Sequence, residues 1–350
     1  MKKILYIVPL IALFFIGCSE DDNPIKALPT SNLNGIVVVN EGTYGSNNSA
    51  LSFISFTNDS SYADVYFSAN NKSLGDNAND IVVVNDTGYI AVDNSNKIEV
   101  VDLNTYKSLG VIDLGVGSSP RNIYIDSDRK GYVSSLYNDE IIRFDINTRS
   151  VLNKIKVGSK PEGIVKANGM LFVANTGFGE SDSVSVVDPS SGTIVKNIKV
   201  GFNPRRMFTA LSGKVIVVCT GKYPPNEVAG GVYIIDPATR TIVDSITVGG
   251  NPSAAALQDD SNLLLVNNTG LYRINLQSKV QTLIITGNNV NSDFGVIYSV
   301  AWDAVTKNIY LGNPRNFTSK GEILKLSESG AILKKYNVGI NPGAIKIFHK

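Results

Sequence analysis

The chain has 350 residues, with 32 lysines and arginines against 31 aspartates and glutamates, and its formal net charge is +1. A near-neutral chain lacks the charged surface that attracts nucleic acid or anionic lipid, so we expect no nucleic-acid partner. His349 is the one histidine, which argues against histidine-based catalysis and histidine–metal sites. A length above that of the usual single domain is typical of repeat architectures.

The first residues have the pattern of a secretory signal. Lys2 and Lys3 precede an apolar run of 13 residues, 4–16, which is too short to span about 30 Å of hydrocarbon but suits a signal peptide. Phe15-Ile16-Gly17-Cys18 resembles the lipobox of bacterial lipoproteins, in which the cysteine becomes the lipidated N-terminus; Phe15 stands where leucine is usual. We expect residues 1–17 to be removed and Cys18 to be lipidated. The alternative is an ordinary membrane anchor with an incidental cysteine.

Residues 18–34 have no apolar period and are rich in Pro, Asn, Asp and Ser, so we interpret them as a lipidated flexible tether. The acidic run Ser19-Glu20-Asp21-Asp22 resembles the surface-export signal of lipoproteins in gram-negative gut anaerobes, although a solvated linker is the alternative. We therefore expect attachment to the outer membrane through the lipid, facing the cell surface. Loss of residues 1–17 removes Lys2 and Lys3, which changes the formal net charge from +1 to −1.

A Val-Gly-x-x-Pro segment recurs along the rest of the chain. It occupies residues 116–120, 157–161, 200–204, 248–252 and 338–342. The prolines lie 41, 43, 48 and 90 residues apart, and the last gap equals two units, so a degenerate repeat lies within it. Ile297 takes the proline position in that repeat and Ala78 takes it in an earlier one. The predicted repeat starts are Ala78, Pro120, Pro161, Pro204, Pro252, Ile297 and Pro342.

Each repeat predicts four short strands. In the repeat that starts at Pro120 they cover residues 122–125, 132–136, 141–145 and 151–157, and the later ones alternate between apolar and polar residues. Four short strands every 41 to 48 residues are typical of a β-propeller blade, because such a sheet must pack against its neighbours to bury both faces.

The two ends of the chain complement each other. Residues 343–348 supply only a first strand, whereas residues 35–67 supply only the later three. Together they form one closing blade, which removes an open sheet edge. The sequence therefore predicts an all-β fold, a seven-bladed β-propeller over residues 35–350. A parallel β-helix is the alternative, but its turns are usually much shorter, and it does not explain the complementary ends.

These motifs also resemble a known group. The Val-Gly-x-x-Pro units, the strand end Ala174-Asn175 and the Asp-Pro turns at 188–189 and 236–237 resemble YncE-like, or surface-layer-type, propeller repeats. The opening residues 39–45 and 49–52 resemble the lipoprotein branch of that group. In that branch the BtuG-type proteins capture cobalamin beside an outer-membrane transporter. The resemblance thus implies a corrinoid as the small-molecule ligand and such a transporter as a partner.

Two kinds of loop share one face of such a propeller, namely the links between blades and the turns between second and third strands. The residue after each repeat start opens an innermost strand at the rim of the central channel. Those residues are Asn79, Arg121, Glu162, Arg205, Ser253, Tyr298 and Gly343.

Aromatic and arginine side chains on this face suit a ligand with flat surface and carboxylate, phosphate or amide groups. The predicted ligand-binding residues are Tyr44, Asn94, Arg121, Tyr137, Asn175, Phe178, Arg205, Tyr223, Asn268 and Arg315. The alternative is that asparagines serve turn geometry and aromatics cap the blades.

Signals for catalysis are weak, and we expect no catalytic residues, metal or cofactor. Residues 126–131 superficially resemble a calcium loop, but Lys130 stands where a ligand oxygen belongs, so we interpret them as a strand turn. Cys219 ends an apolar run and should be buried, and with Cys18 lipidated no intrachain disulfide is possible. Three functions stay open: a surface ligand-binding module, a protein- or glycan-contacting structural module, and a carboxylate-based hydrolase or lyase.

Overall fold

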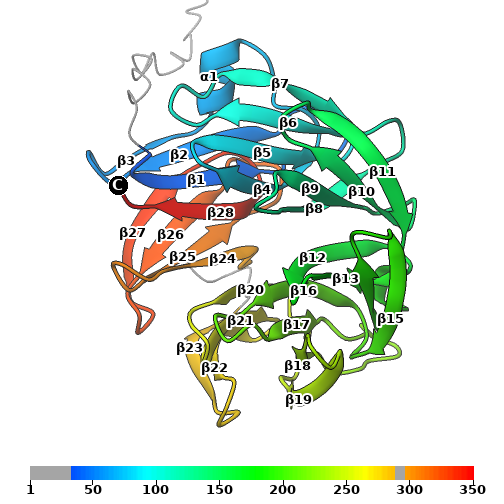
Figure 1. The fold of residues 1–350 in the computed structure, drawn as a ribbon. Helices are drawn as coiled ribbons and strands as arrows, with labels where there is room; N and C mark the ends of the chain where they lie inside the picture. Colours follow the sequence, from blue (N-terminus) through cyan, green and yellow to red (C-terminus); the bar gives the residue numbers. More distant parts are fainter. Residues whose placement is uncertain (1–32, 288–295) are drawn as a thin grey trace, which may run out of the picture.

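A computed structural model describes residues 33–287 and 296–350. The predicted signal peptide, the lipidation site Cys18 and almost all of the tether lie outside the described residues. Within them, seven antiparallel sheets of four strands each are arranged in a ring, which confirms the seven-bladed β-propeller (Figure 1). No helix among the described residues is long and apolar enough to cross a membrane.

The closing blade combines both ends of the chain. From the channel outward it holds β28 (Pro342–Phe348), β1 (Gly35–Asn40), β2 (Ala50–Ser55) and β3 (Ser60–Tyr62). Antiparallel pairing of β28 with β1 sets Gly35 opposite Phe348. Ring closure by the C-terminal strand is therefore confirmed, and the first and last described strands belong to the same blade (Figure 1).

The other six blades each use four consecutive strands, the first of which lines the channel. They are β4 (Ala78–Val84), β5 (Thr87–Val92), β6 (Lys97–Asp102) and β7 (Ser108–Asp113); β8 (Pro120–Ile125), β9 (Lys130–Ser135), β10 (Glu140–Asp145) and β11 (Ser150–Lys156); β12 (Pro161–Ala167), β13 (Met170–Asn175), β14 (Ser183–Asp188) and β15 (Thr193–Lys199); β16 (Pro204–Thr209), β17 (Val215–Cys219), β18 (Gly231–Asp236) and β19 (Thr241–Thr247); β20 (Ala254–Leu257), β21 (Asn262–Asn267), β22 (Gly270–Asn275) and β23 (Gln281–Thr286); β24 (Ser299–Asp303), β25 (Asn308–Asn313), β26 (Glu322–Leu326) and β27 (Ile332–Asn337).

Burial follows strand position within each blade. Second strands such as β17 are buried at every residue, which explains their continuous apolar sequences. Cys219 ends β17 and is buried, as expected. Fourth strands such as β15 are exposed at most positions. Apolar side chains of neighbouring blades pack together, so the core is a ring of interfaces rather than one central mass.

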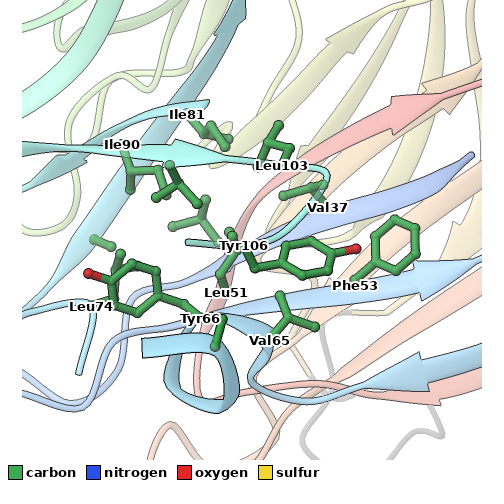
Figure 2. Packing of buried hydrophobic residues seen from close by; sticks show 14 of the residues in the cluster. Val37, Leu51, Phe53, Val65, Tyr66, Leu74, Ile81, Ile90, Leu103 and Tyr106 are labelled. Atoms are coloured by element: carbon green, nitrogen blue, oxygen red, sulfur yellow. The ribbon is translucent and has the colours of Figure 1, made fainter. Parts of the chain in front are cut away.

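The closing blade departs from the sequence prediction in one respect. Residues 35–67 supply the three strands expected, but the third, β3, is only three residues long, and Val65–Asn70 forms a short helix, α1, that was not predicted. The Asp64 side chain accepts a hydrogen bond from the Phe67 N–H and caps the helix. Val65 and Tyr66 are buried in the cluster that joins this blade to the next (Figure 2). The helix therefore adds buried apolar side chains to the interface between these two blades.

One repeat also differs in length. Leu114, not Val116, is the buried residue that corresponds to the valine of the other repeats. The Leu114 N–H donates to the Asn96 carbonyl, just as the Val157 N–H donates to the Asp139 carbonyl in the next repeat. Val116 is 100% exposed. The Val-Gly-x-x-Pro match at 116–120 is thus shifted by a two-residue insertion, and the alignment of that valine with the others was wrong.

A bulge recurs where several innermost strands begin. In β4, β8, β12 and β16 the residues after the repeat start carry one more position than the partner strand opposite them. The pairing of β28 with β1 shifts in the same way. A bulge re-aims side chains that would otherwise alternate between faces. It lets two consecutive residues, such as Arg205 and Arg206, both face the channel.

Candidate ligand-binding site at the channel mouth

A polar hollow of about 70 Å³ lies at one end of the central channel. We call it the channel mouth; it is lined by Glu41, Asn79, Arg121, Asn122, Glu162, Arg205, Arg206, Ser253 and Tyr298. Six of these open or precede innermost strands and were expected at the channel rim from the repeat. The seventh expected residue, Gly343, lines the channel itself. The predicted alignment of the seven repeats is therefore confirmed by this shared location.

The channel continues below the mouth as a larger space of about 400 Å³. Arg205 and Arg206 line both spaces, so they stand at the boundary between them. Further walls of the channel are mostly apolar and include Val82, Phe208 and Trp302, although Asp80 and Lys346 also line this space. The mouth is the smaller and the more polar of the two spaces.

Arg121 is held by side chains from neighbouring blades. Its Nη1 donates to Asn79 Oδ1 at 2.7 Å and lies 3.1 Å from Asp93 Oδ2. Its Nη2 lies 3.3 Å from Glu162 Oε1. Asn79 and Asp93 belong to the blade before that of Arg121 and Glu162 to the blade after it, so Arg121 links three consecutive blades, and most of its donors are already engaged.

Glu162 and Glu41 line the same hollow, but their pKa values are shifted in opposite directions. Burial would raise the pKa of Glu162, but Arg121, Arg205 and Arg206 outweigh it and hold the pKa below its usual value. Burial dominates at Glu41 and raises its pKa, although the Tyr298 hydrogen bond and the arginines oppose the shift. Glu162 is therefore the resident counter-charge, whereas Glu41 is the carboxyl that takes up a proton more readily.

Tyr298 reaches Glu41 across the last two blades. Its Oη donates to Glu41 Oε2 at 2.6 Å. Burial and the neighbouring Glu41 raise the pKa of Tyr298, which keeps its hydroxyl protonated as a donor. Phe317 packs edge-on against the Tyr298 ring at 5.8 Å between centroids. This contact connects the floor of the mouth to the loop between β25 and β26.

Arg205 and Arg206 are much less engaged than Arg121. Arg205 Nε lies 3.8 Å from Glu162 Oε1, a long ion pair, and it makes no hydrogen bond within the described residues. Arg206 has no hydrogen bond or ion pair in the part of the chain that the structure describes; burial and the nearby Arg205 lower its pKa. Ser253 Oγ is also buried without a described partner. The mouth thus holds hydrogen-bond donors of Arg205, Arg206 and Ser253 that have no described partner, and both arginines carry a positive charge.

Aromatic side chains stand on the loops around the mouth. Tyr44, Tyr137 and Phe178 are 67%, 58% and 62% exposed. The rings of Tyr137 and Phe178 lie 6.0 Å apart, with the Lys160 ammonium near both. Tyr44 Oη donates to Asn94 at 3.4 Å. These side chains form an exposed apolar rim above a charged floor.

The remaining predicted residues have mixed positions. Tyr223 is 59% exposed on the loop between β17 and β18, and Asn268 is exposed on the turn between β21 and β22. Arg315 is exposed but paired with Glu322 at 2.5 Å. Asn175 is fully buried, and its amide donates to Ser183 and Ser185 within the blade. The structure thus leaves Asn175 beneath the surface, as a blade-stabilising amide.

Of the residues that line the mouth, the predicted ligand-binding set contained only Arg121 and Arg205, and the seven residues expected at the rim did not include Glu41, Arg206 or Asn122. Strand alternation places the second residue after the repeat start away from the channel, and only the bulge brings Arg206 and Asn122 into it. The Arg205-Arg206 doublet was a usable signal, because two adjacent arginines at a strand start are unusual in a core. Glu41 lies in a predicted mouth loop, but no local pattern distinguishes it there.

Metal-binding signals are absent from the described ranges. No group of three or more His, Cys, Asp or Glu side chains could hold a metal ion among residues 33–287 and 296–350. In the calcium-like segment 126–131, Asp126 pairs with Lys166 and Lys130 pairs with Asp145. This segment is the turn between β8 and β9, as interpreted from the sequence.

Known structures share the fold at low identity. A quinonprotein alcohol dehydrogenase-like protein from Bacteroides thetaiotaomicron has a TM-score of 0.71 at 17% identity, over 91% of this chain and 79% of that one. Hydrazine synthase from Kuenenia stuttgartiensis has a TM-score of 0.63 at 17% identity, over 74% and 85%. U3-55K has a TM-score of 0.58 at 13% identity, over 75% and 82%. Enzymes therefore occur among proteins of this fold, and the likeness shows the fold alone.

No curated protein matches the sequence. The family described as "Domain of unknown function (DUF5074)" matches residues 34–223, more than half of the chain. That range begins at the start of the closing blade and ends in the loop after β17. The chain belongs to the DUF5074 family.

Proposed function

We propose that this protein is a ligand-binding module that captures a small molecule at the channel mouth. The observation that carries the proposal is the pairing of an exposed aromatic rim with a charged floor whose arginines are only partly engaged. Exposed aromatics supply contact area for flat ligand surface, and free guanidinium donors fix polar groups. Loops on a rigid ring hold both in fixed positions.

The sharpest candidate ligand is a corrinoid, which the sequence resemblance implies. A corrinoid offers a flat macrocycle to the rim and amide or phosphate oxygens to the arginines. Calorimetric titration of the full chain with cobalamin tests this. We expect Arg205→Ala with Tyr223→Ala to weaken binding at least thirtyfold, since a central anchor commonly contributes about 2 kcal/mol.

The matched control removes an exposed arginine and an exposed apolar side chain from the opposite face, Arg129→Ala with Leu211→Ala. Unchanged cobalamin affinity is expected there. Loss of binding in the control pair alone would move the site to the opposite face. No cobalamin binding by the wild type would remove the corrinoid and leave other polar ligands as candidates.

We further propose that the lipid on Cys18 anchors the module to the outer membrane, beside a transporter that receives the ligand. Labelled fatty acid should enter the wild type and not Cys18→Ala. Protease added to intact cells should degrade the propeller if it faces outward, and leave it intact if it faces the periplasm. Cross-linking of intact cells should join the protein to an outer-membrane transporter.

A carboxylate-based hydrolase or lyase is a second candidate, favoured by one observation. Glu41 has a raised pKa and lies 2.6 Å from the Tyr298 hydroxyl, beside a channel that ligand can enter. If the site is catalytic, mass spectrometry should detect conversion of a bound ligand by the wild type. Glu41→Gln should then retain binding and abolish conversion, whereas a ligand recovered intact from the wild type argues for binding alone.

A further inference from the structure

We propose that Arg205, Arg206 and Ser253 form an oxyanion site at the floor of the channel mouth, which holds a phosphate or carboxylate group of the bound molecule. The proposal rests on the proposed function and deepens it by naming the chemical group that the site recognises. Three steps support it: an uncompensated cation, a backbone that aims it into the channel, and a space of suitable size.

The first step is the charge of Arg206. Its guanidinium is partly buried in the wall of the channel and close to a second arginine, yet it has no ion pair or hydrogen bond among the described residues. A partly desolvated cation without a partner is unfavourable, because buried charges in proteins are usually paired. An anionic ligand group supplies the missing counter-charge.

Nearby carboxylates are committed to other partners. Glu162 Oε1 pairs with Arg121 Nη2 at 3.3 Å, and its distance to Arg205 Nε is longer, at 3.8 Å. Asp80 attracts Arg206 at longer range, but its two oxygens accept the N–H groups of Ile81 and Ile123 at 2.8 and 3.0 Å. The carboxylates therefore hold the scaffold together without saturating the arginine pair.

The second step is the bulge at the start of β16. One extra residue opposes the partner strand between Pro204 and Arg206, so the adjacent arginines both line the mouth and the channel. Paired guanidinium groups suit the several oxygens of a phosphate or carboxylate. Ser253, which opens the next blade, adds a buried hydroxyl without a described partner.

The third step is size. A hollow of about 70 Å³ accommodates a single oxyanion group but not a whole macrocycle. The rest of the ligand then lies outside this hollow, and the proposal places it outward, against the aromatic rim. The mouth and the rim thus divide recognition between the charged group and the apolar body of one molecule.

Calorimetry and thermal unfolding of the full chain at pH 7, with inorganic phosphate and separately with acetate, test the proposal. We expect Arg206→Gln and Arg205→Gln each to weaken binding of the preferred anion roughly tenfold or more, because hydrogen bonds to charged groups are strong. Arg129→Gln, the same change on the opposite face, should bind as the wild type does. Preference for phosphate or for acetate identifies the source of the oxyanion.

Arg206→Gln should unfold, without added anion, at the same temperature as the wild type or higher, since it removes an unpaired cation. A purely structural arginine would instead lower the unfolding temperature. Failure of the wild type to bind either anion, or full affinity in Arg206→Gln, overturns the proposal.

The two proposals fail in different ways. Cobalamin binding that is unchanged by Arg206→Gln overturns the oxyanion site and keeps the binding module. Phosphate binding that depends on Arg206, without cobalamin binding, keeps the oxyanion site and removes the corrinoid.

Discussion

The two faces of the propeller use polar side chains differently. On the far face, which carries the turns between first and second and between third and fourth strands, many side chains bond to their own turns, although some, such as Lys166 with Asp126, pair between blades. Asn275 Oδ1 accepts the N–H groups of Gln277 and Ser278, and Asp236 Oδ1 accepts those of Ala238 and Thr239. Such bonds close a turn locally and leave little free capacity.

On the mouth face, polar side chains reach between blades. Arg121 bonds to Asn79 and pairs with Asp93 and Glu162 from other repeats, and Tyr298 bonds to Glu41 from the opposite end of the chain. Arg205 and Arg206 keep unused capacity there. The difference indicates that polar groups with satisfied partners, whether within a turn or between blades, maintain the fold, whereas the incompletely engaged arginines of the mouth form the site.

Deletion of residues 342–350 should have the largest effect, because both faces depend on the ring. It removes β28 and exposes the inner edge of β1. We expect the free energy of unfolding to fall by more than about 5 kcal/mol, or cooperative unfolding to be lost. Urea unfolding followed by circular dichroism measures it; an unchanged midpoint would show that β28 does not close the ring.

Glu162→Gln tests the cross-blade network of the mouth. It leaves Arg121 and Arg205 without their shared carboxylate, so we expect a loss of about 3 kcal/mol at pH 7. The folded pKa of Glu162 lies below its usual value, so its contribution is present above that value and lost as pH falls through the folded pKa. Denaturation across acidic pH should therefore show a smaller acid-induced loss in the variant. Equal stability of variant and wild type at pH 7 would contradict the role of Glu162.

Asn275→Ala tests the far face. Its side chain accepts two N–H groups of its own turn, so we expect a loss of only about 1 kcal/mol and no change in ligand binding. Chemical denaturation and the cobalamin titration measure the two effects. A change in ligand affinity would show that the faces are coupled, which the comparison does not allow.

Glu41→Gln should have the smallest effect and the opposite sign. Burial raises the pKa of Glu41, so the ionised carboxyl costs stability above its folded pKa. Glutamine keeps an acceptor for Tyr298 without the charge, and we expect a gain of up to about 1 kcal/mol at neutral pH. The gain should vanish as pH falls and the wild-type carboxyl protonates. Denaturation at several pH values measures it, and a loss at pH 7 would contradict the sign.

The sequence predicted the fold from features that repeat. Pro161 and Pro204 begin innermost strands as expected, and the degenerate starts Ala78 and Ile297 lie in the same ring. The insertion before Pro120 was not predicted. Two extra residues lengthen the link that precedes β8, so Leu114 and not Val116 occupies the buried position of the repeat valine. Helix α1 was not predicted either, because six residues are too few for a periodic signal.

The site was predictable only in outline. Six of the seven first residues after the repeat starts line the mouth as expected, but the engagement of Arg121 depends on Asp93 and Glu162 from other repeats. Local sequence gives no measure of such long-range pairing. It also cannot separate a buried structural amide such as Asn175 from an exposed one such as Asn268. The position of Arg206 depends on a bulge that strand alternation does not predict.

The closing blade has a consequence for the order of synthesis. A ribosome makes β1 first and β28 last, yet Gly35 pairs with Phe348 and the Glu41 N–H bonds to the Asn341 carbonyl. Throughout translation the inner edge of β1 therefore lacks its partner, and the mouth lacks a completed wall. A chain released before residue 342 keeps that edge exposed, so only chains that contain β28 can close the ring.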